Sequence, residues 1–213
     1  WIWNALPASE QNQPNSERTI RVVMDDNYPP YVFRNAEGKL QGILIDEWKL
    51  WSKKTGTQVD LVAMDWADAL DGMKNGEYDV IDTAFYTDER NDWLDFSEPY
   101  VNIAVPIFYN KELTGITDAS SLRGFTVAVK AGDSCIPVLQ RYGVSQILEY
   151  TSYEEIIDAA KAGIIRVFVM DEPPALYYLY QKSIRNEFAQ TGSLYSGQFH
   201  RAVQKGDLAT LHL

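Results

Sequence analysis

Two successive αβ units constrain the fold of this chain more than any other feature of its sequence. From Thr19 onward, short β-rich runs alternate with segments of helical periodicity, an order typical of an α/β sheet with mostly parallel strands. The first unit predicts strands over 19–24, 58–63 and 79–82, and helices over 43–54 and 65–76. Asp65 is expected to cap the second of these helices.

The second unit repeats the pattern after residue 100. It predicts strands over 103–109, 126–130 and 166–170, and helices over 152–163 and 173–182. Ser152 and Glu155 have the spacing of a capping box at the start of the first of these helices. A last strand over 200–204 precedes a helix over 207–213, which is so short that we expect the natural polypeptide to continue.

The net charge and the composition of the chain exclude some classes of binding partner. The chain has 213 residues, and 46% of them are hydrophobic, so it has enough apolar material for a buried core. Its net charge of −11 repels phosphate backbones and anionic lipid surfaces. No stretch reaches the roughly 20 apolar residues needed to cross a bilayer. We therefore expect no nucleic acid as a partner.

The sequence offers few ligands for metal or redox chemistry. Cys135 is the only cysteine, and the two histidines, His200 and His212, lie near the C-terminus. This set allows no internal disulfide, no zinc cluster and no hydrolytic triad. We expect no cofactor, no metal and no catalytic residue. Residues 1–18, with their Gln, Asn, Ser and Pro run, are expected to be a flexible arm outside the fold.

Polar and aromatic side chains follow the predicted strands at their carboxyl ends. In open α/β sheets this edge binds ligands, because loops and helix N-termini present free N–H groups there. The candidate ligand-binding residues are Asp25, Tyr28, Trp66, Thr83, Phe85, Arg90, Asp133, Ser134 and Asp171.

Several of these residues also have ordinary structural explanations. Aspartates that follow strands, such as Asp26, Asp65 and Asp133, are often helix caps or Asx-turns. Trp66 at the start of an amphipathic helix would be a core residue. An arginine in an acidic chain usually pairs with carboxylates on the surface, and Arg90 has aspartates two residues away on either side.

A set of motifs in a fixed order extends from Thr19 to Leu213. They are Ile20-Arg21-Val22-Val23-Met24-Asp25 with Tyr28-Pro29-Pro30-Tyr31, Gly38-Lys39-Leu40-Gln41-Gly42, Thr87-Asp88-Glu89-Arg90, Asp95-Phe96-Ser97-Glu98-Pro99-Tyr100, Val127-Ala128-Val129-Lys130-Ala131-Gly132 and Ala202-Val203-Gln204-Lys205-Gly206. In these motifs the chain resembles the family 3 extracellular solute-binding proteins, which are polar amino-acid receptors of bacterial import systems. It resembles more closely their relatives that serve as periplasmic sensor domains of histidine kinases.

The resemblance implies a type II periplasmic-binding fold, a two-lobed α/β clamshell in which each lobe is a mixed, mostly parallel sheet flanked by helices. Lobe 1 would comprise residues 19–100 and 199–213, and lobe 2 residues 101–198. Hinge strands are expected near 100–104 and 195–199.

Site roles follow from the same resemblance. Arg90, in its Thr-x-x-Arg motif, would hold a ligand α-carboxylate, and Asp171 the α-ammonium, across a gap of metabolite size. Tyr28 and Trp66 would form aromatic walls around the ligand side chain. The family also implies hydroxyl positions, which Thr83 and Ser134 match here.

Two positions depart from the family pattern. Phe85 stands where a small hydroxyl residue is common, and Asp133 replaces a small residue. The bulky ring and the extra acid argue against glutamate or aspartate as the ligand and favour neutral or basic ones.

The expected function is that of a periplasmic, extracytoplasmic sensor domain in a membrane protein of the histidine kinase type. Its partners would be a small amino-acid-like ligand and its own transmembrane and kinase modules, and a homodimer is left open. The alternative is a free-standing amino-acid receptor of an ABC importer, with the permease as partner. A dehydratase-type enzyme is the rival from another class, and it would need a placed general acid or base.

Overall fold

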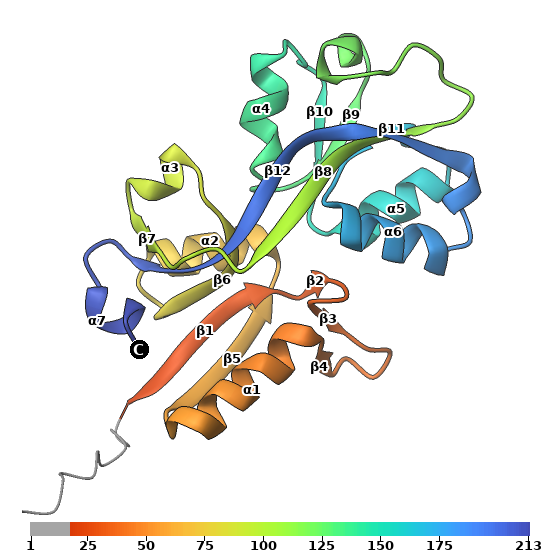
Figure 1. Ribbon diagram of the computed structural model, residues 1–213. Coiled ribbons are helices and arrows are strands. Elements are labelled where there is room, and N and C mark those ends of the chain that lie inside the picture. Colours follow the sequence, from red (N-terminus) through yellow and green to blue (C-terminus); the bar gives the residue numbers. More distant parts are fainter. Residues whose placement is uncertain (1–17) are drawn as a thin grey trace, which may run out of the picture.

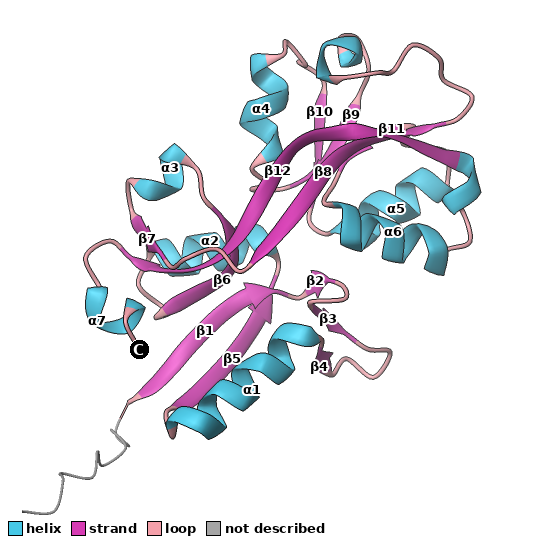
Figure 2. Ribbon diagram, in the orientation of Figure 1, coloured by secondary structure: helices cyan, strands magenta, loops and turns pink. Residues whose placement is uncertain are grey.

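One continuous mixed sheet extends through both parts of the structure (Figure 1). The computed structural model describes residues 18–213. Within this range, the strand order is β10 (Ile147–Tyr150), β9 (Val127–Lys130), β11 (Val167–Val169), β8 (Val101–Asn110), β12 (Phe188–Gln204), β6 (Val80–Phe85), β1 (Thr19–Asp25) and β5 (Gln58–Met64), and β7 (Leu94–Phe96) pairs with the C-terminal end of β12. Helices lie on both sides of the sheet, and the ribbon divides into two lobes joined by β8 and β12 (Figure 2).

The first lobe is built around three parallel strands: β1 (Thr19–Asp25), β5 (Gln58–Met64) and β6 (Val80–Phe85). Its apolar centre includes Val22, Val23 and Met24, which are fully buried. The remaining elements of this lobe are α1 (Ile43–Thr55), α2 (Trp66–Lys74), α3 (Asp88–Asn91), β7 (Leu94–Phe96) and α7 (Leu208–Leu211).

A small three-stranded sheet follows β1 and precedes α1. It consists of β2 (Asn27–Tyr28), β3 (Val32–Arg34) and β4 (Leu40–Gln41). Gly42 begins the entry into α1 with a φ of 129°, and a Cβ atom there would lie 2.2 Å from the carbonyl oxygen of Tyr31. Only glycine fits this close approach of backbone to backbone.

The second lobe contains the other end of the same sheet, with helices on its flanks. Its core includes Phe108 and Phe168, whose rings stack with centroids 5.1 Å apart. Its strands are β9 (Val127–Lys130), β10 (Ile147–Tyr150) and β11 (Val167–Val169), and its helices are η1 (Ala119–Leu122), α4 (Cys135–Arg141), α5 (Tyr153–Lys161), α6 (Glu172–Gln181) and η2 (Arg185–Glu187).

Two long antiparallel strands connect the lobes: β8 (Val101–Asn110) and β12 (Phe188–Gln204). Tyr195 pairs with Val105, and Phe199 pairs with Val101. The C-terminal part of β12 then pairs with β6 and β7 in the first lobe. The expected crossings near 100–104 and 195–199 are therefore hydrogen-bonded neighbours in one ladder.

Some element boundaries differ from the sequence predictions. The strand predicted over 79–82 begins at Val80 and reaches Phe85, because Ala84 and Phe85 pair with β12. The final strand, predicted over 200–204, begins at Phe188, because its pairing with β8 overrides its weak local pattern.

The predicted helix caps are formed in part. The Ser152 side chain accepts from the N–H of Glu155, as expected. The Glu155 carboxylate does not return to Ser152, because it accepts from both the N–H and the hydroxyl of Thr151. Asp65 precedes α2 but makes no side-chain cap bond.

The start of β1 and the C-terminal helix α7 lie on the same side of the first lobe (Figure 1). Most of the expected N-terminal arm, residues 1–17, lies outside the described residues, and Arg18 forms an ion pair with Asp79 at 3.0 Å. In the described part of the chain, no helix is both long and apolar enough to span a membrane.

Candidate functional site

The nine side chains proposed from the sequence line one cavity between the lobes. It lies at the carboxyl ends of β1, β6, β9 and β11, where the loops and helix starts of both lobes meet. Lys130 and Tyr153 line it as well, so the full set is Asp25, Tyr28, Trp66, Thr83, Phe85, Arg90, Lys130, Asp133, Ser134, Tyr153 and Asp171.

Arg90 is a buried cation that contacts both lobes. Thr87 caps the short helix α3 by accepting from the N–H of Arg90, which fixes the direction of the arginine side chain. The guanidinium donates to the carbonyl of Phe85 at 3.0 Å and, across the lobes, to the carbonyl of Gly132 at 3.1 Å. Burial lowers the pKa of Arg90, and the charge of Asp133 partly opposes this shift.

The Arg90 guanidinium also lies over the Trp66 ring, at 5.4 Å from its centroid. Among residues 18–213, none of the ion pairs includes Arg90. The surface ion pair considered for this residue is therefore wrong: Arg90 is only 7% exposed. It is a forked donor whose charge is not matched by a bonded carboxylate.

Asp171 is the complementary group on the second lobe. It occupies the N-cap position of α6 but makes no cap bond, and its carboxylate lines the cavity instead. One oxygen accepts from the Tyr28 hydroxyl at 2.5 Å, and the other has no hydrogen-bond partner. Burial, together with the charge of Asp133, raises the pKa of Asp171 to about 8.

Lys130, at the end of β9, occupies the centre of the site. Its ammonium forms an ion pair with Asp25 of the first lobe, and both side chains are almost fully buried. The Tyr153 ring centroid is 3.8 Å from the ammonium nitrogen, and the Tyr28 and Trp66 centroids lie at 5.6 and 5.9 Å. An acid and three aromatic faces thus surround one cation.

The start of α4 holds two further polar residues. Asp133 accepts from the N–H of Cys135 at 2.9 Å, two residues on, and from the Tyr153 hydroxyl at 2.8 Å, so it forms an Asx-turn and also lines the cavity. Ser134 shares a hydrogen bond of 2.9 Å with the hydroxyl of Tyr195 on β12. The Asx-turn explanation for Asp133 is correct, and it does not remove the residue from the site.

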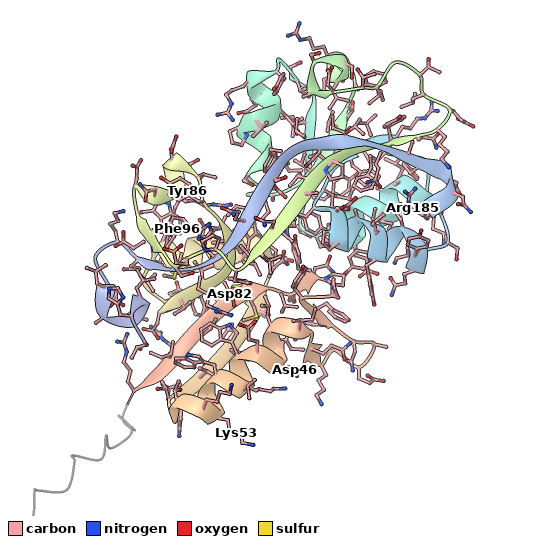
Figure 3. All side chains as sticks on the ribbon, viewed as in Figure 1. Asp46, Lys53, Asp82, Tyr86, Phe96 and Arg185 are labelled. Atoms are coloured by element: carbon pink, nitrogen blue, oxygen red, sulfur yellow. The ribbon has the colours of Figure 1, made fainter. Side chains whose placement is uncertain are left out.

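Thr83 and Phe85, both on strand β6, line the cavity from the first lobe. Thr83 has a φ of 61°, which is uncommon for a β-branched residue. Its N–H donates to the carboxylate of the neighbouring Asp82, which Figure 3 labels near the junction of the lobes. Phe85 fills the space beside Gly197 so closely that a Cβ atom on that glycine would lie 2.1 Å from the ring.

The cavity itself is small. It measures about 20 Å³, which is room for about one water molecule. The expected metabolite-sized gap between Arg90 and Asp171 is therefore not present in this arrangement, in which polar contacts between the lobes enclose the site. Binding of an amino acid requires the lobes to separate further than they do here.

A larger cavity of about 200 Å³ lies elsewhere in the first lobe. Ile20 and Val80, near the starts of their strands, contribute to it together with Trp48 and Trp51 of α1. The charged groups on its lining, Glu47 and Arg201, bond to each other at 2.7 Å. It therefore has no unpaired charge comparable to those of the interlobe site.

Sequence reasoning missed two residues of the cavity. Lys130 is the last residue of the strand predicted over 126–130, and the candidate residues are those that follow the predicted strands. The signal was present, since a lysine ends an otherwise apolar strand. Tyr153 follows the strand β10, which was not predicted. Ligand binding by the nine named residues stays a prediction.

Comparisons with known proteins agree with this architecture. The family model for bacterial extracellular solute-binding proteins, family 3, matches residues 20–212. The virulence sensor protein BvgS of Bordetella pertussis (strain Tohama I) is 25% identical over 177 residues, which are 82% of this chain and 14% of that protein. The L-cystine-binding protein TcyJ of Escherichia coli (strain K12) is 27% identical over 205 residues, covering 92% of this chain and 74% of that protein.

Among solved structures, a histidine kinase sensor domain with similarity to periplasmic binding proteins superposes with a TM-score of 0.85. It is 22% identical, the match covers 92% of this chain and 86% of that one, and at this identity it shows the fold alone. The family model describes solute-binding proteins, and the relatives named here are a binding protein and sensors rather than enzymes. The chain belongs to the bacterial extracellular solute-binding proteins of family 3.

Proposed function

We propose that this chain is the extracytoplasmic sensor domain of a membrane protein of the histidine kinase type, and that it binds a small amino-acid-like solute between its lobes. The observation that carries the ligand class is the pair formed by Arg90 and Asp171. One is a buried guanidinium bonded only to carbonyls, and the other a buried carboxylate with one free oxygen. A zwitterion supplies the opposite charge to each.

Lobe closure is the proposed output. We assign residues 19–100 and 199–213 to lobe 1, residues 101–198 to lobe 2, and the hinge to the paired segments of β8 and β12. A ligand that touches Arg90 on one lobe and Asp171 on the other binds the closed state more tightly than the open one. It therefore shifts the population toward closure.

The sensor role is supported by the match to BvgS and by the solved sensor domain. This chain spans only 14% of BvgS, so signalling by the whole protein is part of the proposal. The alternative is the binding receptor of an importer, which the match to TcyJ favours. An amino-acid ligand fits both roles, and the periplasm is the proposed location in both.

The ligand is tested by thermal unfolding in the presence of each of the twenty amino acids. A ligand at a hundredfold its Kd stabilises the protein by about 2.7 kcal/mol. Arg90→Ala should abolish this shift, because the ligand carboxylate loses its forked donor. Arg166→Ala is the control, since that arginine pairs with an exposed glutamate away from the site. An Arg90→Ala protein that responds like the parent would show that the carboxylate site is misassigned.

The sensor and importer roles are separated by activity of the full-length protein. In a sensor, kinase autophosphorylation in membranes changes when the ligand is added, and Arg90→Ala removes the change. Ligand-dependent uptake without any change in phosphorylation would favour the importer receptor instead.

A further inference from the structure

The cage around Lys130 has the composition of a binding site for an organic cation. Three aromatic rings lie within 6 Å of the ammonium nitrogen, and the Asp25 carboxylate neutralises its charge. Sites that bind ligand cations use the same combination of aromatic faces and an acid. Here the cation in the cage is the ammonium group of Lys130, which belongs to the chain itself. Lys130 lies on the second lobe, whereas Asp25 lies on the first.

The burial of Lys130 shows how completely the cage is filled. The residue is 2% exposed, and lysine is rarely buried to this extent unless it is paired. A second cation in the cage would meet the charge of the first at short range, in a cavity of about 20 Å³. The carboxylate that would attract it, Asp25, is already paired.

The groups left for a ligand are therefore those outside the cage. Arg90 has no bonded carboxylate among the described residues, and Asp171 has a free oxygen. These two groups match the main-chain charges of an amino acid. The remaining acid of the cavity, Asp133, already accepts hydrogen bonds on both carboxylate oxygens, from the Cys135 N–H and the Tyr153 hydroxyl.

We infer that Lys130 is the specificity-determining residue of this site: its ammonium occupies the aromatic cage, so the ligand is a zwitterionic amino acid with a short, uncharged side chain, and basic amino acids are rejected. This inference rests on the proposed amino-acid function and narrows its ligand class from neutral or basic to neutral. It also makes Lys130 a tether between the lobes, through Asp25.

The first test compares glycine, L-alanine, L-serine, L-lysine and L-arginine by calorimetry on the parent and on Lys130→Ala. The parent is expected to bind the short neutral amino acids at least about tenfold more tightly than the basic ones. In Lys130→Ala the cage and the Asp25 carboxylate become free, so this ratio should fall by about tenfold or more in favour of the basic ligands. A parent that prefers L-arginine, or an unchanged ratio in the variant, overturns the inference.

The second test needs no amino acid. Truncation to alanine removes the atoms of an n-propylammonium ion, so n-propylammonium should raise the melting temperature of Lys130→Ala and leave the parent unchanged. If the variant is unfolded alone, the same ion should restore folding. Lys182→Ala is the matched control, because that lysine pairs with Glu154 and Asp158 on helix α5, outside the cage.

A negative result in each test contradicts a different part of the inference. If n-propylammonium has no more effect on Lys130→Ala than on Lys182→Ala, the cage assignment is wrong. If n-propylammonium stabilises Lys130→Ala but the parent binds no amino acid, the cage assignment holds, and both the amino-acid function and the ligand class inferred here are wrong.

Discussion

Thr83 has an unfavourable backbone conformation within the candidate site. An L-residue with a φ of 61° brings its Cβ close to the following carbonyl, and a branched side chain makes this worse. The Asp82 carboxylate holds the strand in this shape by accepting from the Thr83 N–H at 2.7 Å. Strain of this kind persists where the surroundings over-determine the backbone, and it is often found at binding sites.

Glycine should therefore be better tolerated than alanine at position 83. Both substitutions delete the side chain, but only glycine relieves the backbone, so Thr83→Gly should be more stable than Thr83→Ala by about 1 kcal/mol. In an ordinary strand the order is the reverse. Urea unfolding measures the difference. Both variants should bind the ligand more weakly by the same factor, because both lose the hydroxyl that lines the cavity.

Ser183 is the matched control, since it also has a φ of 61° but lies after α6, outside the cavity. Ser183→Gly should likewise be more stable than Ser183→Ala, with ligand affinity unchanged in both. If alanine is the more stable substitution at both positions, the backbone is not strained at either.

The identity of the cavity residues was largely predictable, but their relations to one another were not. Arg90 and Asp171 follow strands, and position after a strand predicts the binding edge of an open sheet. The sequence does not reveal that Lys130 pairs with Asp25, because these residues are 105 positions apart and on different lobes. Nor does it reveal the conformation of Thr83, which depends on a neighbouring carboxylate.

At the scale of elements, local pattern predicted the helices α1, α2, α5 and α6 and the connecting strand β8 closely, but it missed helix α4 and most of the connecting strand β12. The prediction for helix α1 is correct to within one residue at its C-terminal end. It succeeds because the apolar face of the helix and the terminating Gly56 are both local signals. Strand β12 contains Gly192 and Gly197, which interrupt any alternation of apolar residues. Its strand conformation depends on hydrogen bonds to β8, which are non-local and which no local pattern reports.

Helix α5 offers a test of a predicted cap. Ser152→Ala should lower the free energy of unfolding by about 1 kcal/mol, because the N–H of Glu155 loses its acceptor. Asp65→Ala is the comparison: Asp65 precedes α2 without a cap bond, and burial together with four nearby acids raises its pKa, so its removal should cost less. Equal losses in the two variants, measured by urea unfolding, would contradict this account of the caps.

At the scale of the whole molecule, the lobes are held together by polar contacts that converge on the site. The Lys130–Asp25 pair and the Tyr28–Asp171 hydrogen bond cross between them, as does the hydrogen bond from the Glu154 N–H to the Asn27 side chain at 2.9 Å. Several of these groups titrate or carry charge. Closure should therefore respond to pH as well as to ligand.

Asp171 sets the direction of that response. Its pKa rises from 3.8 to about 8 because burial and the charge of Asp133 disfavour the carboxylate. The folded protein therefore keeps a proton that the unfolded chain releases. The stability linked to this proton is fully present below about pH 4 and is lost as the pH rises toward 8, by at most about 1.4 kcal/mol per pH unit.

Asp171→Asn should remove most of this pH dependence, because an amide stays neutral throughout the window. Urea unfolding of the parent and the variant at pH 5, 7 and 9 gives the difference in stability, which should shift in favour of the variant as the pH rises. Asp60→Asn, at an exposed position of β5, serves as control and should follow the parent.

A ligand ammonium beside Asp171 favours the carboxylate, so binding near pH 7 should release a proton, detectable by calorimetry in buffers of different ionisation enthalpy. Parallel curves for the parent and Asp171→Asn, with no proton release on binding, would mean that Asp171 is already ionised in the closed protein.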